Sequence, residues 1–406
     1  MKSHNRVLFI IPTYWPHGTG GSLAMHLLVK LLSKSEGLQL SVLTGTTNPE
    51  MVRRSNVKYI VDPLVRMIER RFPLPSLVLG RYRKILENHD VVYLAYAYTF
   101  IPLAKRLKKR VIVHLHDYKP VSPSAAIPSI CSENLTISKL ISDSFKTKYL
   151  ECKSVDRMLL NIGDSLRTLL ISQWIQNADA IIAVSKRQAE LLAKALPKIK
   201  SKLKVIYNPP PPIPKLNKEF TNEPTFIYLG GESYLKGFYI LLDAITRFLK
   251  KGGKAKFILA GSYDINCVPY LTNLNKVYGN VIQIAGKIPY AEIVSIYQKA
   301  WALIFPSICE EPLPYAIMES LATRTIPLAS EVGGIPELVG STKLKRFLFK
   351  PGSSEELCEK LLNISTLSRA DILELGQYIA DSFQHLSHSI LNENNILKAL
   401  YEIILR

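Results

Sequence analysis

Two glutamates in the second half of the chain have the type and spacing to bind one ligand together. Glu311 and Glu319 flank an expected strand-to-helix turn in the segment Phe305-Pro-Ser-Ile-Cys-Glu-Glu-Pro-Leu-Pro-Tyr-Ala-Ile-Met-Glu319. With helical rise throughout, they are at most about 12 Å apart, so one extended ligand could meet both. Glu319 follows an apolar run, where a carboxylate is seldom left without a partner. Two vicinal ribose hydroxyls would satisfy Glu319, and the hydroxyls of a sugar would suit Glu311.

The turn between these glutamates also offers backbone donors. The N–H groups of Leu313, Tyr315 and Ala316 lie around an expected helix start, where free amides and the helix dipole favour phosphate. Pro312 and Pro314 have no N–H to contribute. The segment therefore predicts a ligand with both hydroxyl and phosphate groups.

A glycine loop with a lysine precedes this segment, in Tyr228-Leu-Gly-Gly-Glu-Ser-Tyr-Leu-Lys-Gly237. Gly230 and Gly231 allow a ligand to approach the backbone closely. Lys236 lies where a helix is expected to begin, so its ammonium and the helix N-terminus could bind one phosphate. A solvated surface lysine ahead of a glycine turn is the alternative interpretation.

A second glycine loop, Pro12–Ser22, joins the first expected strand to an amphipathic helix. Gly18, Gly20 and Gly21 make it a candidate anion-binding loop. Its spacing is G-x-G-G, and no acidic residue closes the second strand, so a dinucleotide site is not indicated. A tight turn with Ser22 as the helix cap is the alternative.

Two histidines close another expected strand, in His114-Leu-His116-Asp117. Strand alternation sends both rings to the same face, and ligands of open α/β sheets bind beyond the carboxyl ends of strands. His116 is the better functional candidate because it is nearer the strand end. A structural role for both histidines stays open, and without a third ligand we expect no metal site.

These groups need a scaffold, and short β-branched and aromatic runs that alternate with helical patterns predict parallel βαβ units. The first series of expected strands is Arg6–Pro12, Gln39–Leu43, Val57–Val61, Asp90–Ala95, Val111–Leu115, Ala180–Val184 and Leu203–Tyr207. The second series is Thr225–Leu229, Lys256–Ala260, Val281–Ala285, Leu303–Phe305, Ile326–Ala329 and Arg346–Phe349. The chain therefore reads as two doubly wound α/β domains.

The proline-rich segment Asn208–Pro214 separates the two series and can form neither a helix nor a central strand. We expect an N-terminal domain over 1–207, a linker over 208–214, a C-terminal domain over 215–385 and a C-terminal helix over 386–406. Packing of that helix back on the N-terminal domain is one option. Residues 117–160 show no clear period and are left unassigned, although a long irregular stretch in a compact domain is often a functional loop.

The composition limits the class of protein. The 406 residues are 47% hydrophobic and 21% charged, which excludes disorder for most of the chain, and a formal charge of +19 favours anionic partners. The five cysteines show no C-x-x-C and predict neither a disulfide framework nor a zinc site. With no secretory signal or membrane-spanning run, we expect a cytoplasmic protein, with the inner face of the membrane as an alternative location.

Basic and apolar residues alternate in the first half of the chain. The basic ones are Arg66, Arg70, Arg71, Arg81, Arg83 and Lys84, followed by the group Lys105–Arg110. Such a surface suits an anionic membrane, and hence a glycolipid or a polyprenyl-phosphate-linked glycan as a partner. An ordinary solvated helix face is the alternative. A nucleic-acid partner would also fit the charge, but no recognition motif is present.

Together these motifs resemble the retaining glycosyltransferases of family 4, of the group 1 type. The resemblance rests on Gly18–Gly21, His116-Asp117, Lys236-Gly237, Glu311-x7-Glu319 and Val332-Gly-Gly-Ile-Pro-Glu337, in the family's order and over nearly the whole chain. It implies the GT-B fold, with two Rossmann-like doubly wound parallel-sheet domains that face a central cleft.

The resemblance also implies roles for single residues. Glu319 would hold the ribose hydroxyls of a nucleotide-sugar donor, Glu311 would contact the donor sugar, and Lys236 would neutralise the diphosphate. His116 would lie beside the donor sugar, and Gly20–Gly21 would approach the donor from the other domain. A hexose-type sugar would pass to a glycan, glycolipid or lipid-linked acceptor by front-face transfer, without a carboxylate nucleophile, a cofactor or a metal.

The chain departs from the family pattern at two positions. Members commonly carry an arginine where this chain has Gly231, and Pro314 replaces a small residue. The first departure leaves open how the diphosphate is neutralised. A catalytically degenerate nucleotide-sugar-binding scaffold subunit of the same fold is therefore the alternative function, and a GT-B epimerase or phosphorylase is a further option.

Overall fold

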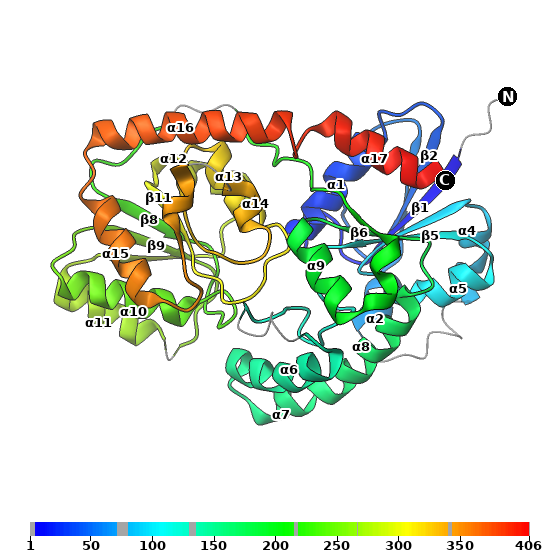
Figure 1. Cartoon of the computed structure of the whole chain (residues 1–406), viewed down its shortest axis with the longest axis horizontal. Coiled ribbons are helices and arrows are strands. Elements are labelled where there is room, and N and C mark those ends of the chain that lie inside the picture. The colour runs from blue at the N-terminus through cyan, green and yellow to red at the C-terminus, as the bar shows by residue number, and fades with distance from the viewer. Residues whose placement is uncertain are drawn as a thin grey trace. The chain divides into compact units, whose positions relative to one another are not determined.

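The chain folds into two compact units, each with its own parallel sheet (Figure 1). The computed structural model describes residues 5–70, 80–129, 135–214, 218–265, 267–339 and 343–405. Unit 1 comprises residues 1–127, 131–209 and 390–406, and unit 2 comprises residues 128–130 and 210–389. Residues 208–214 form neither a helix nor a strand, and the boundary between the units falls after Pro209.

Unit 1 is built on a parallel sheet in the order β3-β2-β1-β4-β5-β6-β7. Its strands are β1 (Asn5–Ile11), β2 (Leu38–Thr44), β3 (Val57–Val61), β4 (Val91–Ala95), β5 (Arg110–Leu115), β6 (Ala180–Ala183) and β7 (Leu203–Val205). β1 pairs with β2 on one side and β4 on the other, so the order of the strands reverses between β1 and β4. Ligands of doubly wound sheets bind beyond the strand ends at such a point.

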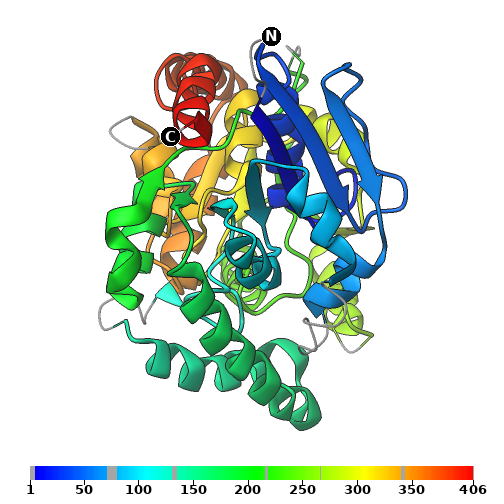
Figure 2. The ribbon, with the colours of Figure 1, turned by 90° about the vertical axis from the view of Figure 1, so that its right-hand side faces the viewer.

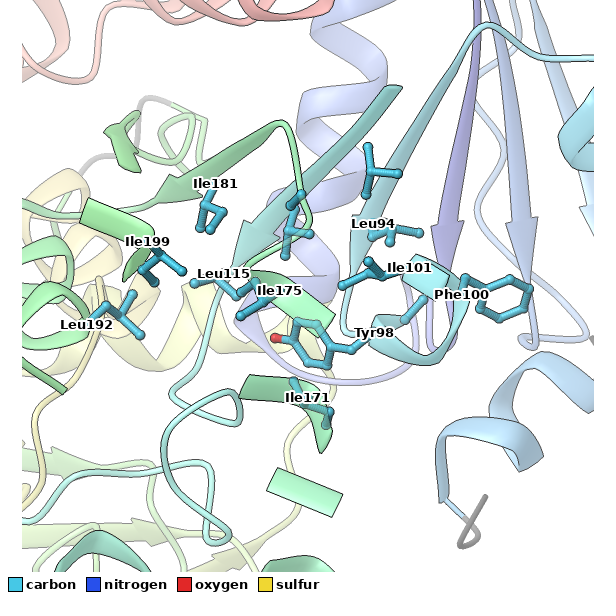
Figure 3. Packing of buried hydrophobic residues seen from close by; sticks show 14 of the residues in the cluster. Leu94, Tyr98, Phe100, Ile101, Leu115, Ile171, Ile175, Ile181, Leu192 and Ile199 are labelled. Carbon is cyan, nitrogen blue, oxygen red and sulfur yellow. The ribbon is translucent and has the colours of Figure 1, made fainter. Parts of the chain in front are cut away.

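Helices cover both faces of this sheet, which explains why β4 is buried along its whole length and β1 is apolar and buried from Val7 onward. The helices of unit 1 are α1 (Gly20–Leu32), α2 (Leu64–Arg70), α4 (Arg83–Glu87), α5 (Ile101–Arg106), α6 (Ile137–Cys152), α7 (Val155–Leu159), α8 (Asn161–Ile175), α9 (Lys186–Ala195) and α17 (Glu393–Leu405), with 3₁₀ turns η1 (Gly80–Tyr82), η2 (Tyr98–Phe100) and η4 (Pro197–Lys202). Figure 3 shows the core on one face, where Leu94 and Leu115 pack with Ile171 and Ile175 of α8.

The core on the other face of the sheet contains side chains from α1 and α17. Ile396, Leu400 and Ile404 of α17 are buried in it with Leu28 and Val29 of α1. Arg110 also donates hydrogen bonds to the carbonyl oxygen of Ile403, at 2.8 and 3.1 Å. α17 is therefore an integral part of unit 1.

Unit 2 repeats the arrangement with the strand order β10-β9-β8-β11-β12-β13. Its strands are β8 (Thr225–Tyr228), β9 (Lys256–Ala260), β10 (Ile282–Gly286), β11 (Ala302–Phe305), β12 (Ile326–Ser330) and β13 (Leu348–Phe349). Its helices are α10 (Phe238–Lys250), α11 (Val268–Tyr278), α12 (Tyr290–Lys299), α13 (Tyr315–Ala322), α14 (Ile335–Val339), α15 (Ser354–Ser365) and α16 (Arg369–His388), with the 3₁₀ turn η5 (Lys343–Phe347). The order reverses between β8 and β11.

The prediction of two doubly wound α/β domains is confirmed, and every expected strand is present with its ends within two residues. The segment 117–160, which could not be assigned from the sequence, contains α6 and α7, which extend away from the sheet of unit 1 (Figures 1 and 2). The C-terminal helix expected over 386–406 begins only at Glu393, as α17, and residues 386–388 end α16 instead, because the backbone leaves the helical region at Ser389 (φ −113°, ψ −101°).

Candidate functional site

Lys236 and Glu311 form an ion pair at the point in unit 2 where the strand order reverses. The ammonium of Lys236 lies 2.7 Å from Oε1 of Glu311, in the loops that follow β8 and β11. Oε1 also accepts hydrogen bonds from the hydroxyl of Ser307 at 2.9 Å and the thiol of Cys309 at 3.6 Å. Glu311 is buried and Lys236 is partly exposed, so the cation stays accessible to a ligand.

Glycine at position 237 lets these two loops approach each other. Gly237 has a φ of +73°, and a Cβ atom there would lie 1.8 Å from the carbonyl oxygen of Pro306. The amide of Ile308 and the hydroxyl of Ser307 both bond to the carbonyl oxygen of Leu235, at 3.0 and 3.1 Å. Lys236 is therefore held beside Glu311 by backbone contacts.

A glycine turn after β12 holds the neighbouring glutamate. Oε2 of Glu310 accepts a hydrogen bond of 2.7 Å from the amide of Gly333, and the amide of Gly334 donates to the carbonyl oxygen of Glu311 at 2.8 Å. Gly333 has a φ of +55°, and a Cβ there would meet the carbonyl oxygen of Glu311 at 1.9 Å. The amides of Gly333 and Gly334 thus hold the side chain of Glu310 and the backbone of Glu311 in place.

Glu319 lies in α13 and is almost fully buried, with 3% of its surface exposed. The hydroxyl of Tyr297, on α12, donates to its Oε2 at 3.4 Å. Burial raises the pKa of Glu319 to about 7, and hydrogen bonds with Tyr290 and Tyr297 oppose that rise. A ligand that supplies two hydroxyl donors would favour the carboxylate form.

The other predicted donor residues of unit 2 lie in the same loops. Leu313 and Tyr315 are buried at the start of α13, and Gly230 and Gly231 follow β8. Gly231 has a φ of +61°, and a Cβ there would lie 3.1 Å from both backbone N and O of Ser262. An arginine at this position would be strained, so the local backbone itself disfavours the family's usual cation.

In unit 1, Gly20 and Gly21 lie in the first turn of α1, and Gly18 precedes the helix. α1 begins at Gly20, and Thr19 is its N-cap residue, so Ser22 is not the cap. The Ser22 hydroxyl donates instead to the carbonyl oxygen of Thr13 at 2.9 Å. A Cβ at Gly21 would lie 1.9 Å from the Tyr96 hydroxyl and 3.0 Å from Cβ of His116. Only glycine brings the start of α1 this close to His116.

His116 and His114 stack on one another at the end of β5, with ring centroids 4.4 Å apart. Nδ1 of His114 hydrogen bonds the Tyr93 hydroxyl at 2.7 Å, which fits the structural interpretation for this ring. Within the described part of the chain, neither ring nitrogen of His116 has a hydrogen-bond partner. Burial lowers the pKa of His116 to about 3, so the ring is neutral at physiological pH. It can donate or accept one hydrogen bond at each nitrogen, according to its tautomer.

Sequence reasoning missed four side chains that position the glutamates: Tyr290, Tyr297, Ser307 and Glu310. The two tyrosines are seven residues apart in α12 and so lie on one helix face, which was the only local signal for them. Glu310 precedes Glu311 directly, but nothing in the sequence shows that its partner is Gly333. Over the ranges that the structure describes, no cluster of three His, Cys, Asp or Glu side chains could hold a metal ion.

Several of the basic residues expected to face a membrane are engaged within unit 1. Arg81 pairs with Asp62 at 3.2 Å, Arg83 with Glu87 at 2.7 Å and Lys105 with Asp179 at 2.8 Å. Arg71 and the side chain of Arg70 lie outside the described residues. The basic segment is therefore partly committed to intramolecular pairs.

Comparisons with known proteins match both halves of the chain. A family model described as glycosyltransferase family 4 matches residues 19–210, and one described as glycosyl transferases group 1 matches residues 212–374. Comparison with curated protein sequences gives no match.

Solved structures of similar fold cover almost the entire chain. HepE of Anabaena, in complex with UDP and glucose, is 17% identical with a TM-score of 0.64, over 98% of this chain and 99% of that one. The sucrose-phosphate synthase of Thermosynechococcus elongatus is 15% identical with a TM-score of 0.66, over 98% and 100%. A glycosyltransferase of Rickettsia africae is 18% identical with a TM-score of 0.61, over 99% and 98%. At these identities the likeness is one of fold.

Proposed function

The chain belongs to the family 4 glycosyltransferases, of the group 1 and GT-B type, and we propose that it transfers a hexose-type sugar from a nucleotide-sugar donor with retention of configuration. The acceptor that we propose is a glycan, a glycolipid or a lipid-linked sugar. The observation that carries the proposal is the Lys236–Glu311 pair, 2.7 Å apart at the reversal point of unit 2. Glu319 follows it in α13, where the ribose would bind.

Unit 2 suits the donor because it combines carboxylates for hydroxyl groups with a cation for phosphate. Glu319 would accept hydrogen bonds from the two ribose hydroxyls, and Glu311 from the donor sugar. Lys236 and the first-turn amides of α10 and α13 would contact the diphosphate. Neither helix has an acidic residue in its first turn, so no local charge opposes the anion.

The proposed chemistry is catalysis by stabilisation of the leaving group. Cleavage of the bond between sugar and phosphate builds negative charge on the diphosphate, and fixed donors that already face that position lower the barrier most. In front-face transfer, the acceptor hydroxyl attacks the sugar from the side that the diphosphate leaves and passes its proton to an oxygen of the departing phosphate, so no carboxylate nucleophile is required. His116, Gly20 and Gly21 of unit 1 would line the region of the donor sugar, with His116 as a neutral hydrogen-bonding group.

UDP is the donor nucleotide to test first. HepE, whose fold is similar, was solved with UDP and glucose. We also propose that the protein acts at the cytoplasmic face of a membrane, where lipid-linked acceptors are presented. No metal has a role in this scheme.

Gly231 favours one alternative, a scaffold subunit that binds the donor without turnover. Its positive φ and the 3.1 Å distance from a Cβ there to backbone atoms of Ser262 would strain the usual arginine, so Lys236 would act without a second cation at that position. Such a subunit would bind the same ligand but would not cleave it.

A thermal-shift panel of UDP-, GDP- and ADP-sugars against the wild type and Glu319→Ala tests the donor site. A ligand at 100 times its dissociation constant stabilises a protein by about 2.7 kcal/mol. We expect one nucleotide to raise the Tm of the wild type and not that of Glu319→Ala, with Glu331→Ala as an exposed control. No shift with any donor would contradict the proposal.

Turnover then separates an enzyme from a scaffold. The assay measures free nucleotide released from the stabilising donor, with and without a lipid-linked acceptor, and we expect release. NMR of the new linkage should show the anomeric configuration of the donor. A Tm shift without any release of nucleotide would favour the scaffold.

A further inference from the structure

The helices α6, α7 and α8 of unit 1 form a hairpin whose packing is inverted relative to an ordinary soluble protein. They pack on one another and, in both views, α6 and α7 extend away from the sheet (Figures 1 and 2). The proposed function assigns no role to this hairpin. Its residues fall in and after the segment in which the sequence showed no clear period.

Small polar side chains occupy the interior of the hairpin. Asn161, Ser165, Thr168 and Ser172 form a stripe on α8 at helical spacing, and all four are buried. On α6 the buried residues include Ser144 and Thr147, and the amide of Asn161 donates to the hydroxyl of Ser144 at 2.6 Å. The buried faces of α6 and α8 therefore carry hydroxyl and amide groups beside Leu140 and Ile171.

Large apolar side chains lie on the outside. Leu160, Ile162, Leu166 and Leu169 are 67%, 52%, 50% and 41% exposed. Ile162, Leu166 and Leu169 share one face of α8 because they are spaced four and three residues apart. In water this arrangement is unfavourable, since it buries hydroxyls and exposes hydrocarbon. Small and polar residues between helices, with apolar residues outward, are typical of helices in an apolar solvent.

α6 presents a different outward stripe, which is basic. Lys139, Ser142, Lys146 and Tyr149 are exposed at helical spacing. Exposed lysines together with exposed apolar residues are the composition of helices that lie in the headgroup region of an anionic bilayer, and tyrosine is enriched at that level. Among the residues that the structure describes, no helix is long and apolar enough to cross a membrane, so the hairpin could only lie in the interface.

The charge of the chain is concentrated in the half that carries the hairpin. Residues 1–210 contain 32 Lys and Arg against 14 Asp and Glu, a net charge of +18, whereas residues 211–406 contain 20 against 19, a net charge of +1. This distribution complements an anionic surface, because basic side chains near such a surface are attracted to its anionic headgroups. Two copies of this same half would repel each other, which disfavours a second copy of the chain as the occupant of the apolar stripe.

We propose that the α6–α8 hairpin is a membrane-docking element, with Ile162, Leu166 and Leu169 inserted into the interface of a bilayer that contains anionic lipid. The C-terminal half of α8 fixes the hairpin to the body, since Ile171 and Ile175 are buried in the core of unit 1. The inference is independent of the donor site, and a UDP-sugar thermal shift monitors that site separately.

Flotation of the full-length protein with vesicles tests the proposal. The wild type should float with phosphatidylcholine vesicles that contain phosphatidylglycerol. The triple variant Ile162→Ser, Leu166→Ser, Leu169→Ser should lose at least about tenfold in partition. The matched control replaces three exposed aliphatic residues of unit 2, Ile265→Ser, Val277→Ser and Leu373→Ser, which are 83%, 64% and 50% exposed in the wild type, and should float like the wild type. Equal flotation of both triple variants, or no flotation of the wild type, would overturn the proposal.

Two further measurements keep the result interpretable. Leu166→Trp should show fluorescence quenching by lipids brominated in their acyl chains, and Val277→Trp should not, which detects insertion even if the triple variant folds poorly. Lys139→Gln with Lys146→Gln should weaken binding to anionic vesicles by about 30-fold. If the triple variant instead converts a dimer to a monomer while its partition into vesicles is unchanged, the stripe binds a second copy and the proposal fails.

Discussion

The two units share a strand order around their reversal points, yet the side chains gathered there differ in kind. The reversal point of unit 1, between β1 and β4, is lined by glycines of α1, Tyr96 and a neutral His116. The reversal point of unit 2, between β8 and β11, is lined by the Lys236–Glu311 pair and the buried Glu319. The net charge has the opposite distribution, +18 in residues 1–210 and +1 in residues 211–406. The fold therefore fixes where loops converge, and the loop residues decide whether that point is ionic or neutral.

Removal of the cation from the ionic site should have the largest effect. Lys236→Met should lower the rate of sugar transfer by about 10²–10³-fold, because the donor that we propose for the leaving group is lost and Glu311 is left without the ammonium of Lys236. The measurement is kcat from initial rates. Lys254→Met, at an exposed lysine of the same unit, is the control. A loss of less than about tenfold would show that another group neutralises the diphosphate.

Substitution of glycines tests how tightly each of the two reversal points is packed. Gly333→Ala should lower the free energy of unfolding by about 2–4 kcal/mol, because its φ is +55° and the Cβ would meet backbone atoms of Glu311. Gly21→Ala should cost roughly 1 kcal/mol, since the closest atom is the hydroxyl at the far end of Tyr96. Urea denaturation measures both. Gly163→Ala, in an open position of α8, should be neutral or stabilising, and equal costs at Gly21 and Gly333 would remove the contrast.

The buried carboxyl groups of Glu319 and Asp117 should affect stability over different pH ranges. The pKa of Glu319 is about 7 in the folded protein and 4.5 as a free group, so the folded state binds the proton more tightly. The stability contributed by that proton is full below pH about 4.5 and is lost as the pH rises through 7, by roughly 3 kcal/mol. Glu319→Gln should abolish this loss, which denaturation at several pH values measures.

The same carboxyl group should make donor binding depend on pH. Because ribose hydroxyls prefer the carboxylate, the Kd for the donor should fall by up to about tenfold from pH 6 to pH 8. In unit 1, burial raises the pKa of Asp117 to about 6, so Asp117→Asn should alter stability at lower pH and leave the pH dependence of donor binding unchanged. A pH-independent Kd in the wild type would remove Glu319 from the donor site.

Substitution at the neutral reversal point of unit 1 should have the smallest effect on the rate of sugar transfer. His116→Ala should lower kcat by about tenfold, the loss expected for one uncharged hydrogen-bonding group. Since its pKa is about 3, the shape of the rate–pH profile between pH 5 and 8 should not change. A profile that loses a limb in His116→Ala would show that this histidine titrates in the working enzyme.

The fold could be predicted from the sequence further than the site could. Buried parallel strands such as β1 and β4 are apolar runs that identify themselves locally, and the glycines and charged residues of the loops follow them directly. Contacts between elements that are distant in the chain have no local sequence signal. Tyr297 meets Glu319 from another helix, and Glu310 binds Gly333 from across a strand connection. The hairpin was missed because its exposed and buried faces have the opposite polarity to the expected pattern.

The place of α17 has a consequence for the order in which the chain is made. The core of unit 1 contains Ile396, Leu400 and Ile404, yet the ribosome delivers these residues only after the whole of unit 2. At 5–20 residues per second, roughly 10–40 s pass between the synthesis of β7 and that of α17. During this interval the apolar residues of α1 that share a core with α17 lack that partner helix. A chaperone therefore has the most apolar surface to protect after β7 has been synthesised and before α17 has.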